Sequence, residues 1–101
     1  MLIAFVLINT AEAATRTPNW IRQALICIHT HEGAWNANTG NGYYGGLQMD
    51  WSFMQAYGPD YLRRWGPAHN WPAEVQIEVA ARAWKTRGFD PWPNTRRMCG
   101  V

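Results

Sequence analysis

The clearest hydrophobic periodicity begins shortly after residue 17. Taken at about 100° per residue, one face of a helix collects three apolar side chains, Ile21, Leu25 and Ile28. Thr17 and Pro18 predict the helix start, with a capping hydroxyl followed by a proline at the first helical position. Gly33 predicts its end, so we expect a helix from residue 18 to about residue 31. Glu32 continues the apolar stripe, which is an unusual place for a carboxylate.

A second long helix is expected to open at Pro72 and close at Gly88. Its apolar face collects side chains at helical spacing, namely Ala73, Ile77, Ala80, Ala81 and Trp84. Glu78 and Arg82 lie one turn apart outside this face, and we expect them to form an exposed ion pair.

Shorter elements are expected between the two long helices. Asp50 can cap a helix over 51–57 that Gly58 and Pro59 interrupt, with a further helical turn near 60–65. Residues 36–46 contain four glycines and three asparagines and predict a loop or irregular hairpin. The pattern indicates one mainly helical α+β domain, closed by an aperiodic tail that lies across its body.

The composition narrows the class of protein. A chain of 101 residues suffices for one small domain, and with 48% hydrophobic residues it is too apolar to be disordered. A net charge of +2 is too small to predict a nucleic-acid partner. Seven tryptophans are a heavy aromatic load. We expect two of them in the core, Trp20 and Trp84, and three as candidates for a ligand cleft, Trp35, Trp51 and Trp71.

The first residues resemble an export signal. An apolar run from Leu2 to Ile8 is too short to span a bilayer, and Ala11-Glu12-Ala13 fits the small-x-small pattern of a cleavage site. We therefore expect a signal peptide at 1–13, a domain over 14–101, a secreted or cell-wall location and no stable membrane anchor.

Cys27 and Cys99 lie near the two ends of the predicted domain. An exported domain of this size generally needs a covalent staple beyond its core, so we expect these cysteines to form a disulfide. Closing so long a loop stabilises a fold by about 4 kcal/mol in the chain-entropy model. The alternative is a pair of buried free thiols in a cytosolic protein.

Glu32 is the leading candidate for chemistry. Burial at the end of an apolar stripe and the negative end of a helix dipole both favour the neutral form of a carboxyl group. A protonated glutamate is what a glycosidase uses to protonate a leaving oxygen. The alternative is a solvated side chain in a frayed last turn. His31 and Glu32 do not continue into the HExxH pattern of zinc proteases, so we expect neither a metal nor a cofactor.

Residues 38–48 interleave amides, a hydroxyl and phenols with glycines that allow a backbone to approach a ligand. Sugar hydroxyls and acetamido groups require such partners, although an ordered loop without a ligand remains an alternative. The spacing of Gly40, Gly42 and Gly45 matches a dinucleotide-binding fingerprint. Because no strand precedes it, we do not interpret it as a nucleotide site. Asp50 is either the helix cap or the second carboxylate of a glycosidase pair.

Residues 32–50, EGAWNANTGNGYYGGLQMD, closely resemble the catalytic domain of resuscitation-promoting factors, the transglycosylase-like muralytic proteins of actinobacteria. Residues 74–80 and the segment from Trp92-Pro93 to Cys99 extend the resemblance, although the family usually places a cysteine where His31 stands. The resemblance implies a small lysozyme-like domain that cleaves the β-1,4 bond between N-acetylmuramic acid and N-acetylglucosamine. It implies Glu32 as the catalytic acid and base. The candidate substrate-binding residues are Thr39, Tyr44 and Gln48, to which we add Asp50 and Trp51.

On this basis we expect a monomer that acts on peptidoglycan glycan strands, with other cell-wall hydrolases as candidate partners. Two alternatives belong to other classes. One is a peptidoglycan-binding or signalling module without turnover. The other is a small disulfide-stapled inhibitor or effector.

Overall fold

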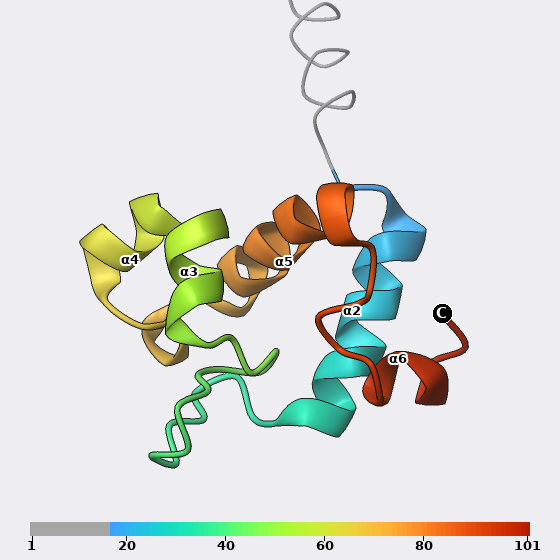
Figure 1. The fold of residues 1–101 in the computed structure, drawn as a ribbon, viewed down its shortest axis with the longest axis horizontal. Helices are drawn as coiled ribbons and strands as arrows, with labels where there is room; N and C mark the ends of the chain where they lie inside the picture. Colours follow the sequence, from blue (N-terminus) through green and yellow to red (C-terminus); the bar gives the residue numbers. More distant parts are fainter. Residues whose placement is uncertain (1–16) are drawn as a thin grey trace, which may run out of the picture.

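Within residues 17–101, two long helices and four short ones form the domain (Figure 1). The computed structural model describes residues 17–101, so the predicted signal peptide lies outside the described residues. The helices are α2 (Asn19–Glu32), α3 (Trp51–Tyr57), α4 (Pro59–Trp65), η1 (Ala68–Asn70), α5 (Ala73–Arg87) and α6 (Thr95–Met98). Over these residues, β structure is limited to the antiparallel bridges Asn38–Tyr44 and Tyr44–Met49. A mainly helical small domain with an irregular hairpin is thus confirmed.

The start of α2 differs from the prediction. Pro18 is the N-cap, and its carbonyl accepts from the backbone N–H groups of Ile21 and Arg22, both at 3.1 Å. Thr17 makes no capping bond, because the helix begins one residue later than its hydroxyl would require. The helix continues to Glu32 and ends at Gly33, close to the predicted boundary.

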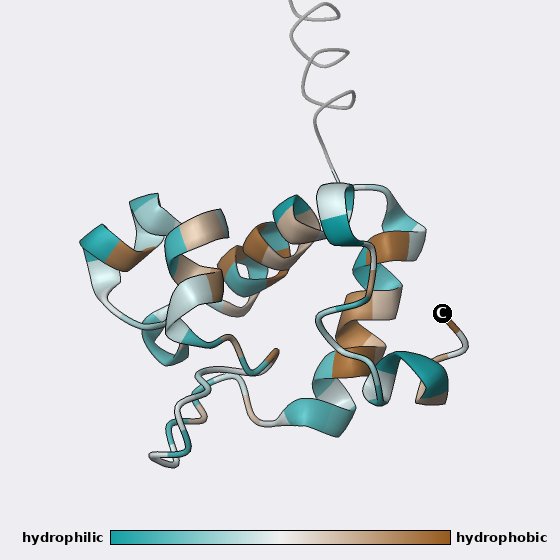
Figure 2. Ribbon diagram, viewed as in Figure 1, coloured by the Kyte–Doolittle hydropathy of each residue, from teal (hydrophilic) through white to brown (hydrophobic). Residues whose placement is uncertain are grey.

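The core forms where α2 and α5 pack together, with α6 on the other flank of α2. Figure 2 shows apolar bands along both long helices. The buried residues of α2 are Ile21, Ala24, Leu25 and Ile28, and those of α5 include Ile77, Val79, Ala80, Ala81 and Ala83. No helix within the described range has the length and apolar character needed to cross a membrane.

Trp20 corrects one expectation about the core. Its side chain is 57% exposed and meets the half-buried Trp84 edge-on, with ring centroids 5.5 Å apart. The reason is helical geometry, since Trp20 directly precedes Ile21 and points about 100° away from the buried stripe.

A polar cluster fixes α4 against α5. The predicted pair forms, with Arg82 Nη2 2.7 Å from Glu78 Oε2, and Arg82 also donates to both carboxylate oxygens of Asp60 and to the carbonyl of Tyr57. The Arg82 hydrogen bond lowers the pKa of Asp60 below its usual value, which stabilises the ionised carboxylate at neutral pH.

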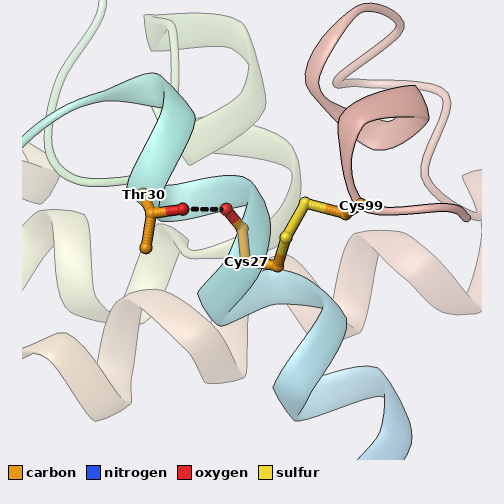
Figure 3. The surroundings of a disulfide bond; sticks show 3 residues. All are labelled: Cys27, Thr30 and Cys99. Atoms are coloured by element: carbon orange, nitrogen blue, oxygen red, sulfur yellow. Dashed lines mark hydrogen bonds between the residues drawn. A yellow bond between two sulfur atoms is a disulfide. The ribbon is translucent and has the colours of Figure 1, made fainter.

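A disulfide joins Cys27 in α2 to Cys99 at the end of α6 (Figure 3). The two residues are separated by 72 positions, and their Cα atoms lie 6.0 Å apart. Thr30 lies one helical turn after Cys27, and its hydroxyl donates to the Cys27 carbonyl. The expected disulfide is confirmed, and the tail is held across the body.

We predict that the paired replacement of Cys27 and Cys99 by serine lowers the free energy of unfolding by about 4 kcal/mol, because the long loop is no longer closed in the unfolded chain. Urea denaturation followed by tryptophan fluorescence measures the change. Ser52→Ala, which leaves both cysteines in place, is the control variant. A loss below about 1 kcal/mol would show that the tail is held by packing alone.

Candidate functional site

Two neighbouring hollows form one groove beside the hairpin. The smaller, of about 220 Å³, is lined by Glu32, Tyr43, Gln48, Pro91, Trp92, Pro93 and Asn94. The larger, of about 400 Å³, is lined by Tyr43, Leu47, Gln48, Met49, Asp50, Ser52, Phe53, Ala56, Tyr57, Arg87, Pro91 and Trp92. The hollows share Tyr43, Gln48, Pro91 and Trp92, and we refer to them together as the groove. Its walls come from the hairpin (residues 38–49), α3 and the tail (residues 88–101). Glu32 at the end of α2 and Arg87 at the end of α5 also line it.

Glu32 stands at one end of the groove, as the last residue of α2. Its side chain is half-buried, and among residues 17–101 no hydrogen-bond donor contacts its carboxylate. Gly33 then brings the hairpin close, since a Cβ atom at this position would lie 3.4 Å from Gln48 Nε2. A carboxylate with unpartnered oxygens and an amide therefore line the same hollow.

Gln48 is held in a backbone conformation that few non-glycine residues adopt. Its φ is 49°, in the left-handed region. Reciprocal backbone bonds of 2.9 Å between Tyr44 and Met49 close the turn around it, and its Nε2 donates to the Gly45 carbonyl at 2.9 Å. Such local strain persists only where the surroundings enforce it and is typical of ligand-binding positions.

Gln76 of α5 anchors the hairpin through hydrogen bonds of its side-chain amide. It is completely buried, its Oε1 accepts from the Gly46 N–H at 2.8 Å, and its Nε2 donates to the carbonyls of Trp35 and Trp71, each at 2.9 Å. A Cβ atom at Gly45 would lie 2.4 Å from Gln76 Oε1, so only glycine fits there. This amide therefore fixes the hairpin to the helix.

The tail supplies the wall opposite the hairpin. Trp92 is buried, lines both hollows, and donates from Nε1 to the Leu47 carbonyl at 2.8 Å. Sequence reasoning placed this tail across the body but did not identify Trp92, Asn94 or Arg87 as groove residues. The available signal was an aromatic residue between two prolines, in a segment tied down by a cysteine.

The predicted substrate-binding residues are only partly brought together. Gln48 and Asp50 line the groove, whereas Thr39 is exposed in the hairpin and lines neither hollow. Tyr44 stacks on His69, with ring centroids 5.6 Å apart, and meets Trp51 edge-on at 6.5 Å. Trp51 is 47% exposed and follows Asp50 directly, but its side chain also lies outside both hollows.

Asp50 acts as a helix cap. Its Oδ1 accepts from the backbone N–H of Phe53 at 2.8 Å, at the start of α3. This confirms the capping interpretation of Asp50, while the same residue also borders the larger hollow.

The other two proposed cleft tryptophans, like Trp51, lie outside both hollows. Trp71 is only 3% exposed, and its Nε1 donates to the Gly66 carbonyl at 2.7 Å, so the buried ring serves the core. Trp35 stacks on His29, with centroids 3.6 Å apart, and packs against Gly46. The Trp35 ring thus seats the hairpin while the Trp71 ring fills the core, because a small core must bury much of its aromatic area.

One set of potential metal ligands occurs within the described residues. The ligand atoms of Cys27, His31 and Cys99 lie within 4.8 Å of one another. The two sulfur atoms are bonded to each other, so they offer no thiolate to a metal.

A family model and individual relatives agree on the family of this chain. Residues 13–95 match the family model described as a transglycosylase-like domain. The chain is 43% identical over 69 residues to resuscitation-promoting factor Rpf1 of Corynebacterium glutamicum, covering 68% of this chain and 35% of that protein. It is 40% identical over 68 residues to resuscitation-promoting factor RpfE of Mycobacterium tuberculosis, covering 67% and 34%. With RpfC of the same species it is 35% identical over 106 aligned positions, covering 100% and 67%. The chain thus spans about a third of the length of the first two relatives.

We predict that Gln76→Met destabilises the domain by about 3 kcal/mol or more. Methionine fills a similar volume but leaves one buried N–H and two buried carbonyls without partners, each costing about 1–3 kcal/mol. Urea denaturation measures the loss, and Gln23→Met, at an exposed position on α2, is the matched control. Equal stability of the two variants would contradict the anchoring role of Gln76.

Proposed function

This chain belongs to the transglycosylase-like domain family, and on that premise we propose that it cleaves the glycan strands of peptidoglycan. The scissile bond is the β-1,4 linkage between N-acetylmuramic acid and N-acetylglucosamine. The observation that carries the proposal is the half-buried carboxylate of Glu32, which lines the groove together with the amide of Gln48. The description of the matching family model as a transglycosylase-like domain supports the same class of activity.

Glu32 is proposed as the general acid. A neutral carboxyl group at the end of the groove donates its proton to the glycosidic oxygen as that bond breaks, while positive charge develops on the muramic acid ring. Having no competing donor among the described residues, the carboxylate is free to face the substrate. The Gln48 amide, held by Gly45, offers a fixed partner for a hydroxyl or acetamido group.

The role of Asp50 separates two forms of this chemistry. Its Oδ1 is engaged by the Phe53 N–H, and Glu32 is the other carboxylate that lines the groove within the described residues. We therefore assign Asp50 a structural role and infer that the substrate's own N-acetyl group stabilises the positive ring. Glu32, now a base, then takes the proton of the muramic acid 6-hydroxyl as that oxygen closes onto the anomeric carbon. The product is an anhydro sugar, and no water is consumed.

We further propose that the domain acts outside the cell, at the wall. The disulfide supports this location, because such bonds persist in oxidising compartments. Peptidoglycan is the expected partner, and we propose that the domain acts as a monomer.

We predict that Glu32→Gln lowers the rate at which soluble fragments form from purified peptidoglycan by about a thousandfold, because glutamine cannot transfer a proton. Mass spectrometry of the soluble products gives the rate and the chemistry together, since an anhydro product is lighter than a reducing one by one water molecule. Glu74→Gln, on an exposed part of α5, is the matched control.

Reducing ends from the unaltered chain would overturn the anhydro mechanism while leaving a glycosidase. The absence of product from the unaltered chain, with binding to insoluble peptidoglycan retained, would instead identify a binding module.

We predict that Asp50→Asn changes the rate of cleavage by less than about threefold. Asparagine caps a helix as well as aspartate does, so the fold is kept while the charge is removed. The assay is the same product measurement, combined with thermal unfolding to verify that α3 is intact. A loss comparable to that of Glu32→Gln would make Asp50 the second catalytic carboxylate.

A further inference from the structure

The groove carries one positively charged side chain, and we propose that this residue, Arg87, binds a carboxylate of the glycan substrate. The inference rests on the proposed function, because it assigns a substrate group to a position in the same groove. It makes Arg87 a residue that selects muramic acid-containing glycans over neutral ones.

The charges of the groove are distributed unevenly. Among the residues lining it, the ionic side chains are Glu32, which borders only the smaller hollow, and Asp50 and Arg87, which border only the larger one. Asp50 is held at the start of α3 by the Phe53 N–H. Among the residues that line the groove, Arg87 is therefore the one cationic partner for an anionic substrate group, and it lies in the hollow that Glu32 does not border.

Arg87 is placed to serve a ligand. It is the last residue of α5, and Gly88, with a φ of 58°, turns the chain away immediately after it. Three other arginines are used in ion pairs, Arg22, Arg82 and Arg96. Within residues 17–101 Arg87 forms no ion pair, and it is exposed while lining the larger hollow. Its guanidinium can therefore donate a planar pair of N–H groups to an incoming carboxylate.

Peptidoglycan offers that carboxylate in two places. In peptide-free strands it is the lactyl carboxylate of N-acetylmuramic acid, and in peptide-bearing strands it is a carboxylate of the stem peptide. Chitin has the same β-1,4 linkage and acetamido groups but no carboxylate. A hydrogen bond from the Gln48 amide to an acetamido group can form with both polymers. A guanidinium distinguishes them, because only peptidoglycan carries a carboxylate.

A structural role for Arg87 makes a different prediction. A cation in the last turn of a helix is favoured by the helix dipole, and its loss would lower stability without regard to the ligand. The discriminating quantity is therefore the ratio of affinities for charged and neutral glycans, measured beside thermal stability.

The test measures dissociation constants by calorimetry in a Glu32→Gln background, which prevents turnover. The ligands are a peptide-free tetrasaccharide containing muramic acid, the same tetrasaccharide with stem peptides, and a chitin tetrasaccharide. We predict that Arg87→Gln weakens binding of a muramic acid ligand about fivefold, the scale of a partly exposed charge pair, and leaves chitin binding unchanged. Arg87→Lys should retain most of the affinity, and Arg63→Gln, an exposed residue of α4 outside the groove, is the matched control.

The two peptidoglycan ligands identify the source of the carboxylate. A loss confined to the peptide-free ligand assigns the lactyl group, and a loss confined to the peptide-bearing ligand assigns the stem. Equal effects of Arg87→Gln on all three ligands, or no effect on any, would overturn the proposal. Failure of the proposed function is seen separately, as the absence of product from the unaltered chain, and does not alter the ratio of affinities.

Discussion

The buried amide of Gln76 is the contact on which the groove depends. An amide is suited to this position because its oxygen accepts the Gly46 N–H while its nitrogen donates to the carbonyls of Trp35 and Trp71. A carboxylate could not donate, and an apolar side chain would leave three backbone groups unpaired in the interior. Since the hairpin has only two bridges of its own, its shape is determined by this helix, and the turn that holds Gln48 follows from it.

The opposite wall depends on a covalent constraint. The disulfide ties the tail from Gly88 onward to α2, and the bond from Trp92 to the Leu47 carbonyl holds it against the hairpin. Three segments that are distant in the sequence thus meet around Glu32. Covalent closure is a sensible way to stabilise such a site in a domain too small to rely on its core alone.

The sequence was sufficient to predict the helices and the catalytic candidate, and insufficient to predict the side chains that seat the hairpin. Periodicity located α2 and α5 because both bury a continuous stripe, and local chemistry gave the helix cap as one of two roles for Asp50. Gln76 was missed because a polar residue on a helix is ordinarily assigned to solvent, and its burial depends on tertiary partners. Trp71 was taken for a cleft residue because an aromatic residue in a loop carries no signal of the direction in which it points. Trp92 was missed because the tail acquires its neighbours only on folding, and Arg87 was missed because a cation in the last turn of a helix is ordinarily assigned to solvent.

The separation of charges along the groove has a consequence for how binding and cleavage are coupled. In the reaction proposed above, Glu32 gives up and takes back a proton, so its contribution depends on protonation. A guanidinium keeps its charge at every pH at which proteins remain folded, so a strand held by Arg87 keeps its orientation while the acid cycles. Because the two groups border different hollows, a carboxylate bound at Arg87 stays away from Glu32. In the proposed reaction, one small groove thus holds the anionic strand at Arg87 and places the proton donor in the neighbouring hollow.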